Sequence, residues 1–190
     1  AWEMFRITQV LIQGGHNPNL GIEYYEDAFK LIRKKFPQVG VHGLSVSEID
    51  MIAKVEKSST KEVLARLKEA GLQSIPGAGA EILVDSVKDI ISPKKITSNE
   101  WLNIMEEAHS MGLPASATMM YGHVESAHDI AEHFVKIAKL QEKTGGFMAF
   151  IPWSFEPNNT LMQKEKTVIY AAGGFQLLKM IAISKIMYDG

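Results

Sequence analysis

Two adjacent glycines and a histidine follow a short apolar run near the start of the 190-residue chain. The run Val10–Ile12 leads into Gln13, Gly14, Gly15 and His16. Glycine lets the backbone turn sharply or approach a bound molecule closely. We therefore predict a buried strand that ends in a turn, whose backbone could contact the amino or carboxylate group of a ligand, with an ordinary tight turn as the alternative.

His42 lies inside a second predicted strand, and Ser45 and Glu48 follow where that strand ends. The imidazole could point into the interior of a barrel, although a histidine in a strand is often a core residue whose hydrogen bonds are satisfied. The polar residues that follow strengthen the case for a pocket, and we take His42, Ser45 and Glu48 as candidate pocket residues.

The turn Pro76–Glu81, PGAGAE, leads into a helix predicted over about 81–90. A glycine-rich turn before a helix could hold phosphate at the helix N-terminus, but the Gly-Lys-Ser/Thr of a nucleotide-binding P-loop is missing. Glu81 in the first helical turn is explained by the helix dipole alone. The functional alternative is that its carboxylate accepts hydrogen bonds from ribose hydroxyls.

The segment TMMYGHVE, residues 118–125, closes a further predicted strand. Tyr121 and the two methionines before it would line a pocket, and Gly122 would let the chain turn. His123 and Glu125 would supply polar groups at this strand end.

Three histidines, His16, His42 and His123, stand at predicted strand ends, and imidazole is a common metal ligand. A histidine-rich metal site is therefore an open alternative. The remaining three lie on predicted helices, where we expect them to be solvated: His109, His128 and His133.

The run Phe150–Trp153 is apolar and aromatic at the end of the last predicted strand. Such a surface suits the stacking of a flat ring such as adenine, and plain core is an equally good explanation. No Ser-His-Asp spacing, aspartate dyad or lysine in an apolar strand stands out, so hydrolase and Schiff-base chemistry have little support.

A repeated strand–helix unit must position these turns. Strands are predicted to start near residues 9, 39, 72, 115 and 147, and spacings of about 30–43 residues are those of a βα unit. A (β/α) barrel and an open doubly wound sheet both fit, and both place function at the carboxyl ends of the strands. We prefer the barrel because no strand is followed by a dinucleotide-binding glycine fingerprint. The predicted fold is α/β, a partial (β/α) barrel of about five parallel strands with outer helices, forming a single domain over residues 1–190.

Composition places the chain among ordinary globular proteins, since 46% of residues are hydrophobic, 22% are charged and the net charge is −2. So small a charge argues against a nucleic-acid partner. No apolar run approaches the ~20 residues of a membrane helix, and we expect a cytoplasmic protein. The absence of cysteine excludes a disulfide, a thiolate metal site and a cysteine nucleophile within these residues.

Taken together, the motifs resemble one family. QGGHNP, FPQVGVHGLSVSEI, LKEAGLQSIPGAGAEIL, WLNIMEEAHSMGLP, SATMMYGHVES and TGGFMAFIPWSFEPNNT are similar, in this order, to the radical S-adenosylmethionine (radical SAM) enzymes of the futalosine route to menaquinone. The resemblance covers about residues 7–188. HGLSVSEI and FIPWSFEP look more like the cyclase branch than the aminofutalosine synthase branch, and PGAGAEIL and TGGFMAFIPW look more like the cyclase branch than the deazaflavin (FO) synthase subunit. Both of these branches stay open as alternatives.

The resemblance implies a partial (β/α)6 barrel and two cofactors, S-adenosylmethionine and a 4Fe-4S cluster that cleaves it to a 5′-deoxyadenosyl radical. The implied substrate is a small nucleoside, dehypoxanthine futalosine. The radical would take a hydrogen atom from its ribose, and the sugar radical would close onto the benzoate ring. Neither nucleic acid nor a membrane is an expected partner.

The resemblance also implies roles for individual positions. Gly14 and Gly15 match the glycines that meet the methionine amino group, with His16 where many relatives have glutamate. Glu81 matches the position near the ribose. The other implied cofactor-binding positions lie near the adenine: Gly122, Glu125, Ile151 and Pro152. The implied substrate pocket consists of His42, Ser45, Glu48, Tyr121, His123 and Trp153.

One feature of the family is missing from this sequence. The family holds its cluster with a CxxxCxxC motif after the first strand, and the chain has no cysteine. We therefore expect a fragment that starts at the family's second strand and is inactive by itself. A barrel without its first strand would expose an edge and apolar interior surface, which invites self-association. A cluster-free barrel that binds a nucleoside or serves as an assembly partner is the alternative of another class.

Overall fold

The computed structural model describes residues 6–168, 170 and 172–188. The chain divides into two compact units, the first made of Ala1–Gly79 and Asn103–Ala115 and the second of Ala80–Leu102 and Ser116–Gly190. Helix α6 (Ser98–Ser110) starts in the second unit and ends in the first. Within the described residues, no helix is both long and apolar enough to cross a bilayer.

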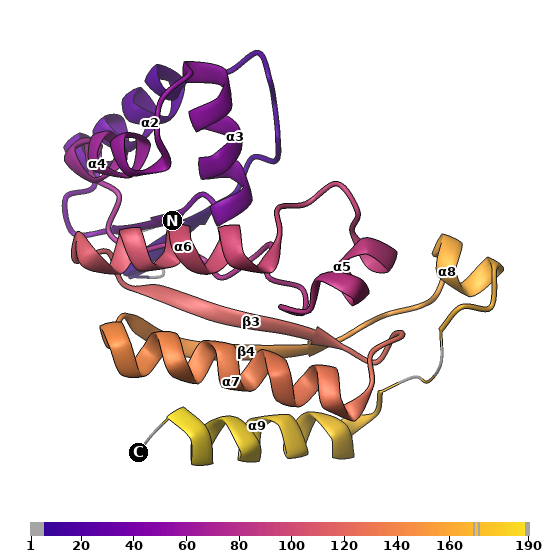
Figure 1. Cartoon of the computed structure of the whole chain (residues 1–190). Coiled ribbons are helices and arrows are strands. Elements are labelled where there is room, and N and C mark those ends of the chain that lie inside the picture. Colours follow the sequence, from indigo (N-terminus) through magenta and orange to yellow (C-terminus); the bar gives the residue numbers. More distant parts are fainter. Residues whose placement is uncertain (1–5, 169, 171, 189–190) are drawn as a thin grey trace. The chain divides into compact units, whose positions relative to one another are not determined.

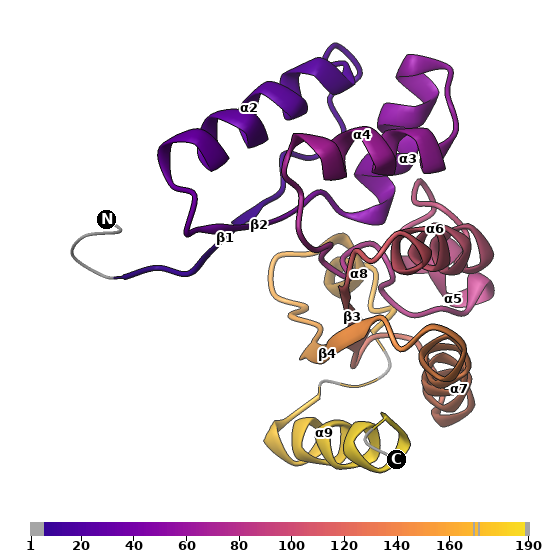
Figure 2. The ribbon, with the colours of Figure 1, turned by 90° about the vertical axis from the view of Figure 1, so that its left-hand side faces the viewer.

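The first unit is built on two parallel strands, β1 (Gln9–Ile12) and β2 (Gly40–Gly43). Three helices gather on one side of this pair, as Figures 1 and 2 show: α2 (Ile22–Lys35), α3 (Val46–Glu56) and α4 (Thr60–Ala70). Helix α4 packs against both α2 and α3. The sequence starts α3 and α4 with capping boxes, in which an N-cap serine and a glutamate three residues later satisfy each other's backbone N–H groups.

Side-chain alternation along β2 decides which residues face the helices. Val41 is fully buried, and a Cβ placed on Gly43 would lie 3.7 Å from the ring of Phe29 in α2. His42 therefore lies on the opposite face of β2. Its partner in the strand register is Leu11, which is 61% exposed.

The third predicted strand, just after α4, is not formed as a strand. Only two isolated parallel bridges occur there, between His42 and Ser74 and between Ile75 and Ala115. Pro76 follows immediately and has no N–H to donate, which ends the pairing. The described residues therefore hold four strands, and the prediction of about five is wrong at this position.

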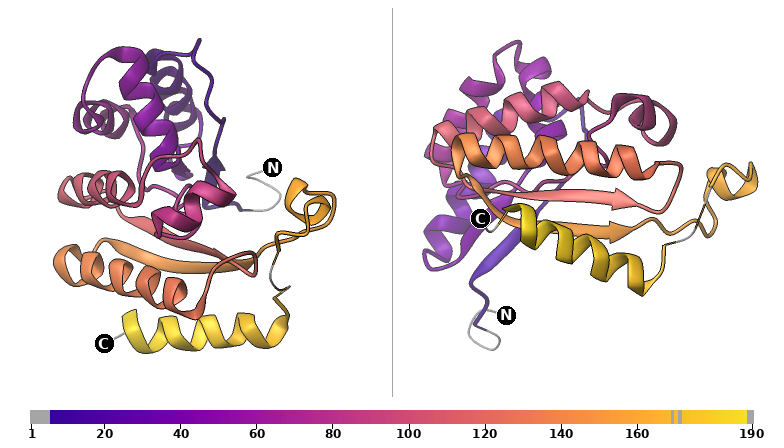
Figure 3. Two further views of the ribbon diagram at one scale, coloured as in Figure 1. Left: turned by 45° about the vertical axis from the view of Figure 1, so that its right-hand side comes forward. Right: turned by 60° about the horizontal axis from the view of Figure 1, so that its bottom comes forward.

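The second unit contains β4 (Phe147–Ser154) and all but the first residue of β3 (Ala115–Tyr121), and the two strands point in the same direction in Figure 1. Helices α7 (Ala127–Thr144) and α9 (Gly174–Tyr188) lie side by side, and α9 also packs against β4 (Figure 3). Two short helices complete this unit: α5 (Asp85–Ile91) and α8 (Leu161–Lys164).

A buried hydrophobic cluster joins the strands and long helices of the second unit. It contains Met119 and Tyr121 of β3, Phe134 of α7 and Met180 of α9, and Phe150 of β4 packs against it. We call these residues the α7–α9 cluster. Because successive strand residues point to opposite faces, Met119 and Tyr121 face this cluster together.

Helix α5 starts four residues later than the sequence predicts. Glu81 has φ 49°, in the left-handed region, which is incompatible with a helical turn. The acidic residue in the first turn of α5 is Asp85. The helix-dipole explanation of Glu81 is therefore wrong.

Large apolar side chains are exposed on β1 and β4. Leu11 of β1 and Met148, Ile151 and Trp153 of β4 are between 43% and 61% exposed. An incomplete barrel is expected to expose such residues, and the self-association expected from them stays a prediction.

Candidate functional site

A buried carboxylate holds the glycine turn after β1. Oε1 of Glu48 accepts hydrogen bonds from the backbone N–H groups of Gly14, at 2.7 Å, and Gly15, at 3.0 Å. Oε2 accepts from the backbone N–H and from the hydroxyl of Ser45, each at 2.7 Å. Glu48 is only 3% exposed, so the four donors surround it inside the protein. These contacts join the turn after β1 to the start of α3.

This arrangement limits what the glycine turn can bind. Two adjacent N–H groups would suit the carboxylate of a ligand, but Glu48 already occupies both. The turn therefore carries the negative charge of Glu48, which favours the amino group of a ligand over its carboxylate. His16 lies exposed just beyond the turn.

His42 lies on the face of β2 opposite to the helices. Its Nδ1 is 2.7 Å from Oγ of Ser74. Burial lowers the pKa of His42, and a hydrogen bond with the backbone of Ser74 opposes this only in part. The ring is therefore neutral near pH 7, and its Nε2 can make one hydrogen bond to a ligand.

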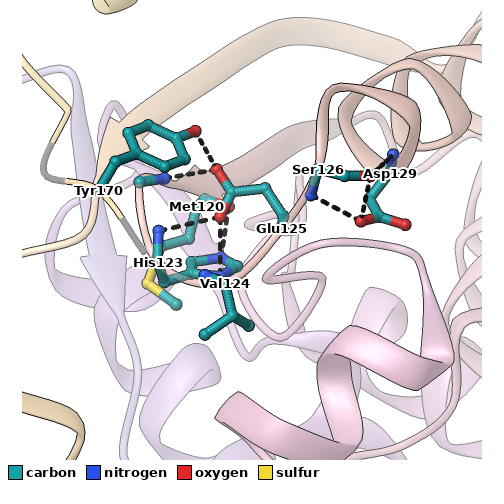
Figure 4. A network of polar contacts seen from close by, with 8 residues as sticks. Met120, His123, Val124, Glu125, Ser126, Asp129 and Tyr170 are labelled. Atoms are coloured by element: carbon teal, nitrogen blue, oxygen red, sulfur yellow. Dashed lines mark hydrogen bonds and ion pairs between the residues drawn. The ribbon is translucent and has the colours of Figure 1, made fainter. Parts of the chain in front are cut away.

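A second buried carboxylate holds the turn after β3 (Figure 4). Glu125 accepts hydrogen bonds from the backbone N–H groups of Gly122, at 2.6 Å, and His123, at 2.9 Å, and from the hydroxyl of Tyr170. The side chains of Glu125 and His123 are fully buried. Burial by itself raises the pKa of Glu125, but hydrogen bonds from His123, Gly122 and Tyr170 outweigh it and lower the pKa to about 2. The carboxylate is therefore ionised at neutral pH.

The imidazole of His123 has competing partners. Its Nδ1 lies 2.9 Å from Oε2 of Glu125 and 2.8 Å from the backbone nitrogen of Val124. Its Nε2 lies 3.2 Å from the carbonyl oxygen of Met120. A neutral ring with its proton on Nε2 satisfies Val124 and Met120, so Glu125 gains a donor from this ring only when Nδ1 is protonated.

Gly122 is required at its position by both conformation and packing. Its φ is 91°, and a Cβ there would lie 2.7 Å from Cβ of Ala172. Tyr170 and Ala172 therefore both contact residues of this turn. Sequence reasoning missed Tyr170, because no local pattern relates it to a carboxylate 45 residues earlier.

Tyr121 lies in the α7–α9 cluster rather than beside a pocket. It is fully buried against Phe134 and Met180, and burial raises its pKa. Among the described residues its hydroxyl has no hydrogen-bond partner. The expectation that Tyr121 and Met119 line a pocket differs from this placement, because strand alternation turns both toward α7 and α9. Met120 lies on the other face of β3.

The aromatic end of β4 is exposed on one face. Ile151 and Trp153 are 43% and 44% exposed and lie opposite to Phe150, whereas alternation puts Pro152 on the side of Phe150. Exposed apolar side chains at a strand end can cover a flat ring. Ile151 and Trp153 are therefore placed to contact such a ring, and Pro152 is not.

The turn before α5 is fixed by two lysines. The carboxylate of Glu81 pairs with Lys95, and the carbonyl of Glu81 accepts a hydrogen bond from Met120 at 2.7 Å. Lys88 donates to the carbonyl of Ala80 at 3.1 Å. It is 3% exposed, and burial lowers its pKa to about 8. Sequence reasoning missed Lys88, because a lysine in a short helix gives no local signal of burial.

His133 is not solvated, contrary to the expectation from the sequence. It is fully buried on α7, its Nδ1 accepts a hydrogen bond from Leu83 at 3.0 Å, and burial lowers its pKa to about 3. Its spacing of four and seven residues from Ile137 and Leu140 places it on the apolar face of α7, a signal that could have predicted its burial. His128 is exposed, as expected, and His109 is half-buried.

The structure brings the predicted residues together in two groups. One group, in the first unit, contains Gly14, Gly15, Ser45 and Glu48, and the other, in the second unit, contains Gly122, His123 and Glu125. Throughout the described part of the chain, no three His, Asp or Glu side chains gather as a metal site requires. The histidine-rich metal site considered from the sequence therefore has no support.

A cavity of about 320 Å³ lies elsewhere in the second unit. Residues of β4, α7 and α9 line it, among them Phe147, Phe150, Gln141 and Tyr188. Both amide atoms of Gln141 are bound to the backbone of Phe147. Of the residues singled out from the sequence, only Phe150 of the run Phe150–Trp153 lines this cavity.

Two family models match successive parts of the chain. The Radical SAM superfamily model matches residues 1–137, and the model of the CofH/MqnC C-terminal region matches residues 144–190. A cyclic dehypoxanthine futalosine synthase from Streptomyces coelicolor is 41% identical over 96% of this chain and 45% of its own length.

Two further relatives carry other names. A 5-amino-6-(D-ribitylamino)uracil–L-tyrosine 4-hydroxyphenyl transferase 1 from Methanosarcina mazei is 40% identical over 99% of this chain and 50% of its own length. An aminodeoxyfutalosine synthase from Thermus thermophilus is 35% identical over 96% of this chain and 49% of its own length. The chain therefore spans about half the length of the curated relatives it matches.

Proposed function

Because this chain belongs to the radical SAM superfamily, we propose that it is the part of a cyclic dehypoxanthine futalosine synthase that holds S-adenosylmethionine and the nucleoside substrate. The observation that carries the proposal is the 41% identity to the Streptomyces coelicolor enzyme over 96% of this chain. The reaction converts dehypoxanthine futalosine to its cyclic form on the route to menaquinone.

The residues present do not fit an iron–sulfur cluster. Thiolates are the usual ligands of a 4Fe-4S cluster, and these 190 residues contain no cysteine. We place the cluster ligands in a part of the protein outside these residues. The work of this chain is then to bind and orient S-adenosylmethionine and the substrate and to keep water away from them.

The glycine turn after β1 suits the amino end of S-adenosylmethionine. The Glu48 carboxylate beside Gly14 and Gly15 attracts a cationic amino group and repels a carboxylate. Because four donors hold that carboxylate, its position is set before the ligand arrives. Such preorganisation reduces the entropy lost on binding.

The second unit suits the adenosine end. Glu125 occupies the N–H groups of Gly122 and His123, so their turn offers a ligand its carbonyl oxygens, which accept hydrogen bonds from an amino group such as that of adenine. Trp153 supplies exposed apolar surface for the ring. The oxygen of Glu81 that does not pair with Lys95 would accept a hydrogen bond from the ribose.

The proposal is tested with the complete protein, reconstituted with iron and sulfide without oxygen. It is incubated with S-adenosylmethionine, a reductant and dehypoxanthine futalosine, and the products are identified by mass spectrometry. We expect 5′-deoxyadenosine and the cyclic product. If none of the candidate substrates leads to 5′-deoxyadenosine, the proposal is contradicted.

A second candidate rests on the Methanosarcina mazei relative, which is 40% identical over 99% of this chain. The same assay with 5-amino-6-(D-ribitylamino)uracil and L-tyrosine decides between the two reactions. Turnover of this pair, without turnover of dehypoxanthine futalosine, would replace the proposal. Calorimetry covers the non-enzymatic alternative, since nucleoside binding by a protein that never forms 5′-deoxyadenosine would indicate a binding module.

A further inference from the structure

Two residues from late in the chain, Tyr170 and Ala172, contact the turn after β3. The hydroxyl of Tyr170 donates to Oε1 of Glu125, and Ala172 lies against Gly122 so closely that a Cβ on Gly122 would lie 2.7 Å from Cβ of Ala172. The turn belongs to the residues that match the Radical SAM superfamily, whereas Tyr170 and Ala172 belong to those that match the CofH/MqnC C-terminal region. Residues of one family region therefore hold a turn of the other.

Tyr170 is the dependable side-chain donor to Glu125. The other side chain in contact, His123, donates to Glu125 only when its Nδ1 is protonated, because Val124 claims the unprotonated nitrogen. Burial raises the pKa of Tyr170, and its hydrogen bond to Glu125 raises it further, so the hydroxyl keeps its proton at any ordinary pH. A fully buried carboxylate that loses such a donor keeps the two backbone N–H groups and a His123 nitrogen for which Val124 competes.

We propose that Tyr170 is a positioning residue for the turn Gly122–Glu125. Its hydroxyl fixes the Glu125 carboxylate, and the carboxylate in turn keeps the N–H groups of Gly122 and His123 directed inward. The carbonyl oxygens of the turn are then held ready for a ligand. This last step rests on the proposed function, which assigns the turn to the adenosine end of S-adenosylmethionine.

The positioning role is tested on the 190-residue chain without any ligand. Tyr170→Phe removes the hydroxyl and keeps the ring, and Tyr24→Phe is the matched control, because Tyr24 is 58% exposed in the other unit. Amide hydrogen exchange at Gly122 and His123 is followed by NMR. We expect exchange about tenfold faster at both amides in Tyr170→Phe, since hydrogen bonds to charged groups are strong, and no change in the control. Equal exchange at both amides in Tyr170→Phe and the parent would overturn the proposal.

A titration gives a second readout, which a merely space-filling tyrosine would not move. The carboxyl ¹³C signal of Glu125 is followed with pH in both variants. In the parent it titrates at about 2, and in Tyr170→Phe it titrates at a higher pH because a donor to the charged form is gone. If Tyr170→Phe does not fold, the ring ¹³C signal of Tyr170 in the parent and in Glu125→Gln decides. Titration of Tyr170 at a lower pH in Glu125→Gln than in the parent supports the contact, because the Glu125 carboxylate raises the pKa of the tyrosine, and equal titration in both overturns it.

Calorimetry separates this inference from the proposed function. S-adenosylmethionine is titrated into the parent, Tyr170→Phe and Tyr24→Phe. Weaker binding in Tyr170→Phe alone supports both ideas together. If the parent does not bind S-adenosylmethionine, the assignment of the turn to adenosine fails, while the exchange rates still decide whether Tyr170 positions the turn.

Discussion

Two buried glutamates hold two strand-end turns, one in each unit, and they do so differently. Glu48 and Glu125 each accept hydrogen bonds from two consecutive backbone N–H groups, those of Gly14 and Gly15 after β1 and those of Gly122 and His123 after β3. Glu48 lies on α3, more than 30 residues after the turn that it holds. Glu125 belongs to the turn that it holds.

The difference determines where each turn gets its rigidity. Glu48 joins two segments, and its second oxygen is satisfied by the N-cap serine, so nothing further is needed. Glu125 accepts hydrogen bonds from the backbone of its own turn, and Val124 competes with it for the nearby nitrogen of His123. Tyr170 supplies the remaining donor. We therefore expect the first turn to depend on Glu48 alone and the second to depend on a distant segment.

The largest effect is expected from Glu48→Gln. In glutamine an NH₂ group replaces one of the two carboxylate oxygens. This group cannot accept hydrogen bonds, so the buried donors on its side of the amide would be left unsatisfied. We expect a loss of about 4 kcal/mol in the free energy of unfolding, measured by urea denaturation. Glu69→Gln, at an exposed position on α4, serves as the control, with a change below about 0.5 kcal/mol. Equal stability of the two variants would show that Glu48 does not hold the first turn.

Glu125→Gln tests the second turn through its dependence on pH. The pKa of Glu125 is about 2 in the folded protein against an ordinary value of 4.5, so its stabilisation is complete above pH 4.5 and disappears as the pH falls toward 2. The difference corresponds to about 3 kcal/mol. We expect the stability gap between parent and Glu125→Gln, measured by urea denaturation, to shrink by up to this amount between pH 5 and about pH 2. A gap that stays constant over this range would mean that the Glu125 carboxylate is not specially stabilised.

Gly15→Ala and Gly122→Ala compare the packing around the two turns, and we expect smaller changes in stability from them than from the glutamate variants. Both glycines have positive φ, 73° and 91°, and alanine loses about 1 kcal/mol in that conformation. A Cβ at Gly15 meets nothing within 4 Å, whereas a Cβ at Gly122 meets Ala172. We expect thermal unfolding to show a cost about 1 kcal/mol greater for Gly122→Ala. The same cost at both positions would indicate that the segment at Ala172 does not pack on the second turn.

The smallest expected effect lies outside both turns. Ser74→Ala removes the hydroxyl that contacts Nδ1 of His42 and should lower the free energy of unfolding by about 1 kcal/mol. Ser154→Ala, on the exposed end of β4, is the control. Because neither carboxylate is involved, hydrogen exchange at Gly14 and Gly122 should stay unchanged. Faster exchange at either glycine would contradict the expectation that the contact between Ser74 and His42 is independent of the two turns.

Local chemistry explains which features the sequence predicted. The apolar run before Gly14 and the glycine turn after β3 are each encoded within a few residues, and the structure confirms them as a strand end and a turn. The prediction that the first strand is buried is wrong, because the residues of β1 are exposed or half-buried and Leu11 is 61% exposed. The left-handed conformation of Glu81 is not encoded locally, and it moved the start of α5. The contact of Tyr170 with Glu125 crosses 45 residues and required the folded chain.

The account depends most on the idea that the turn after β3 contacts S-adenosylmethionine, which an NMR titration tests directly. S-adenosylmethionine is added to the ¹⁵N-labelled protein, and the amide signals of Gly122 and His123 are followed. The account predicts that both signals shift with one dissociation constant, while the signals of exposed residues on α4 stay in place. An absence of shifts at both amides would contradict it.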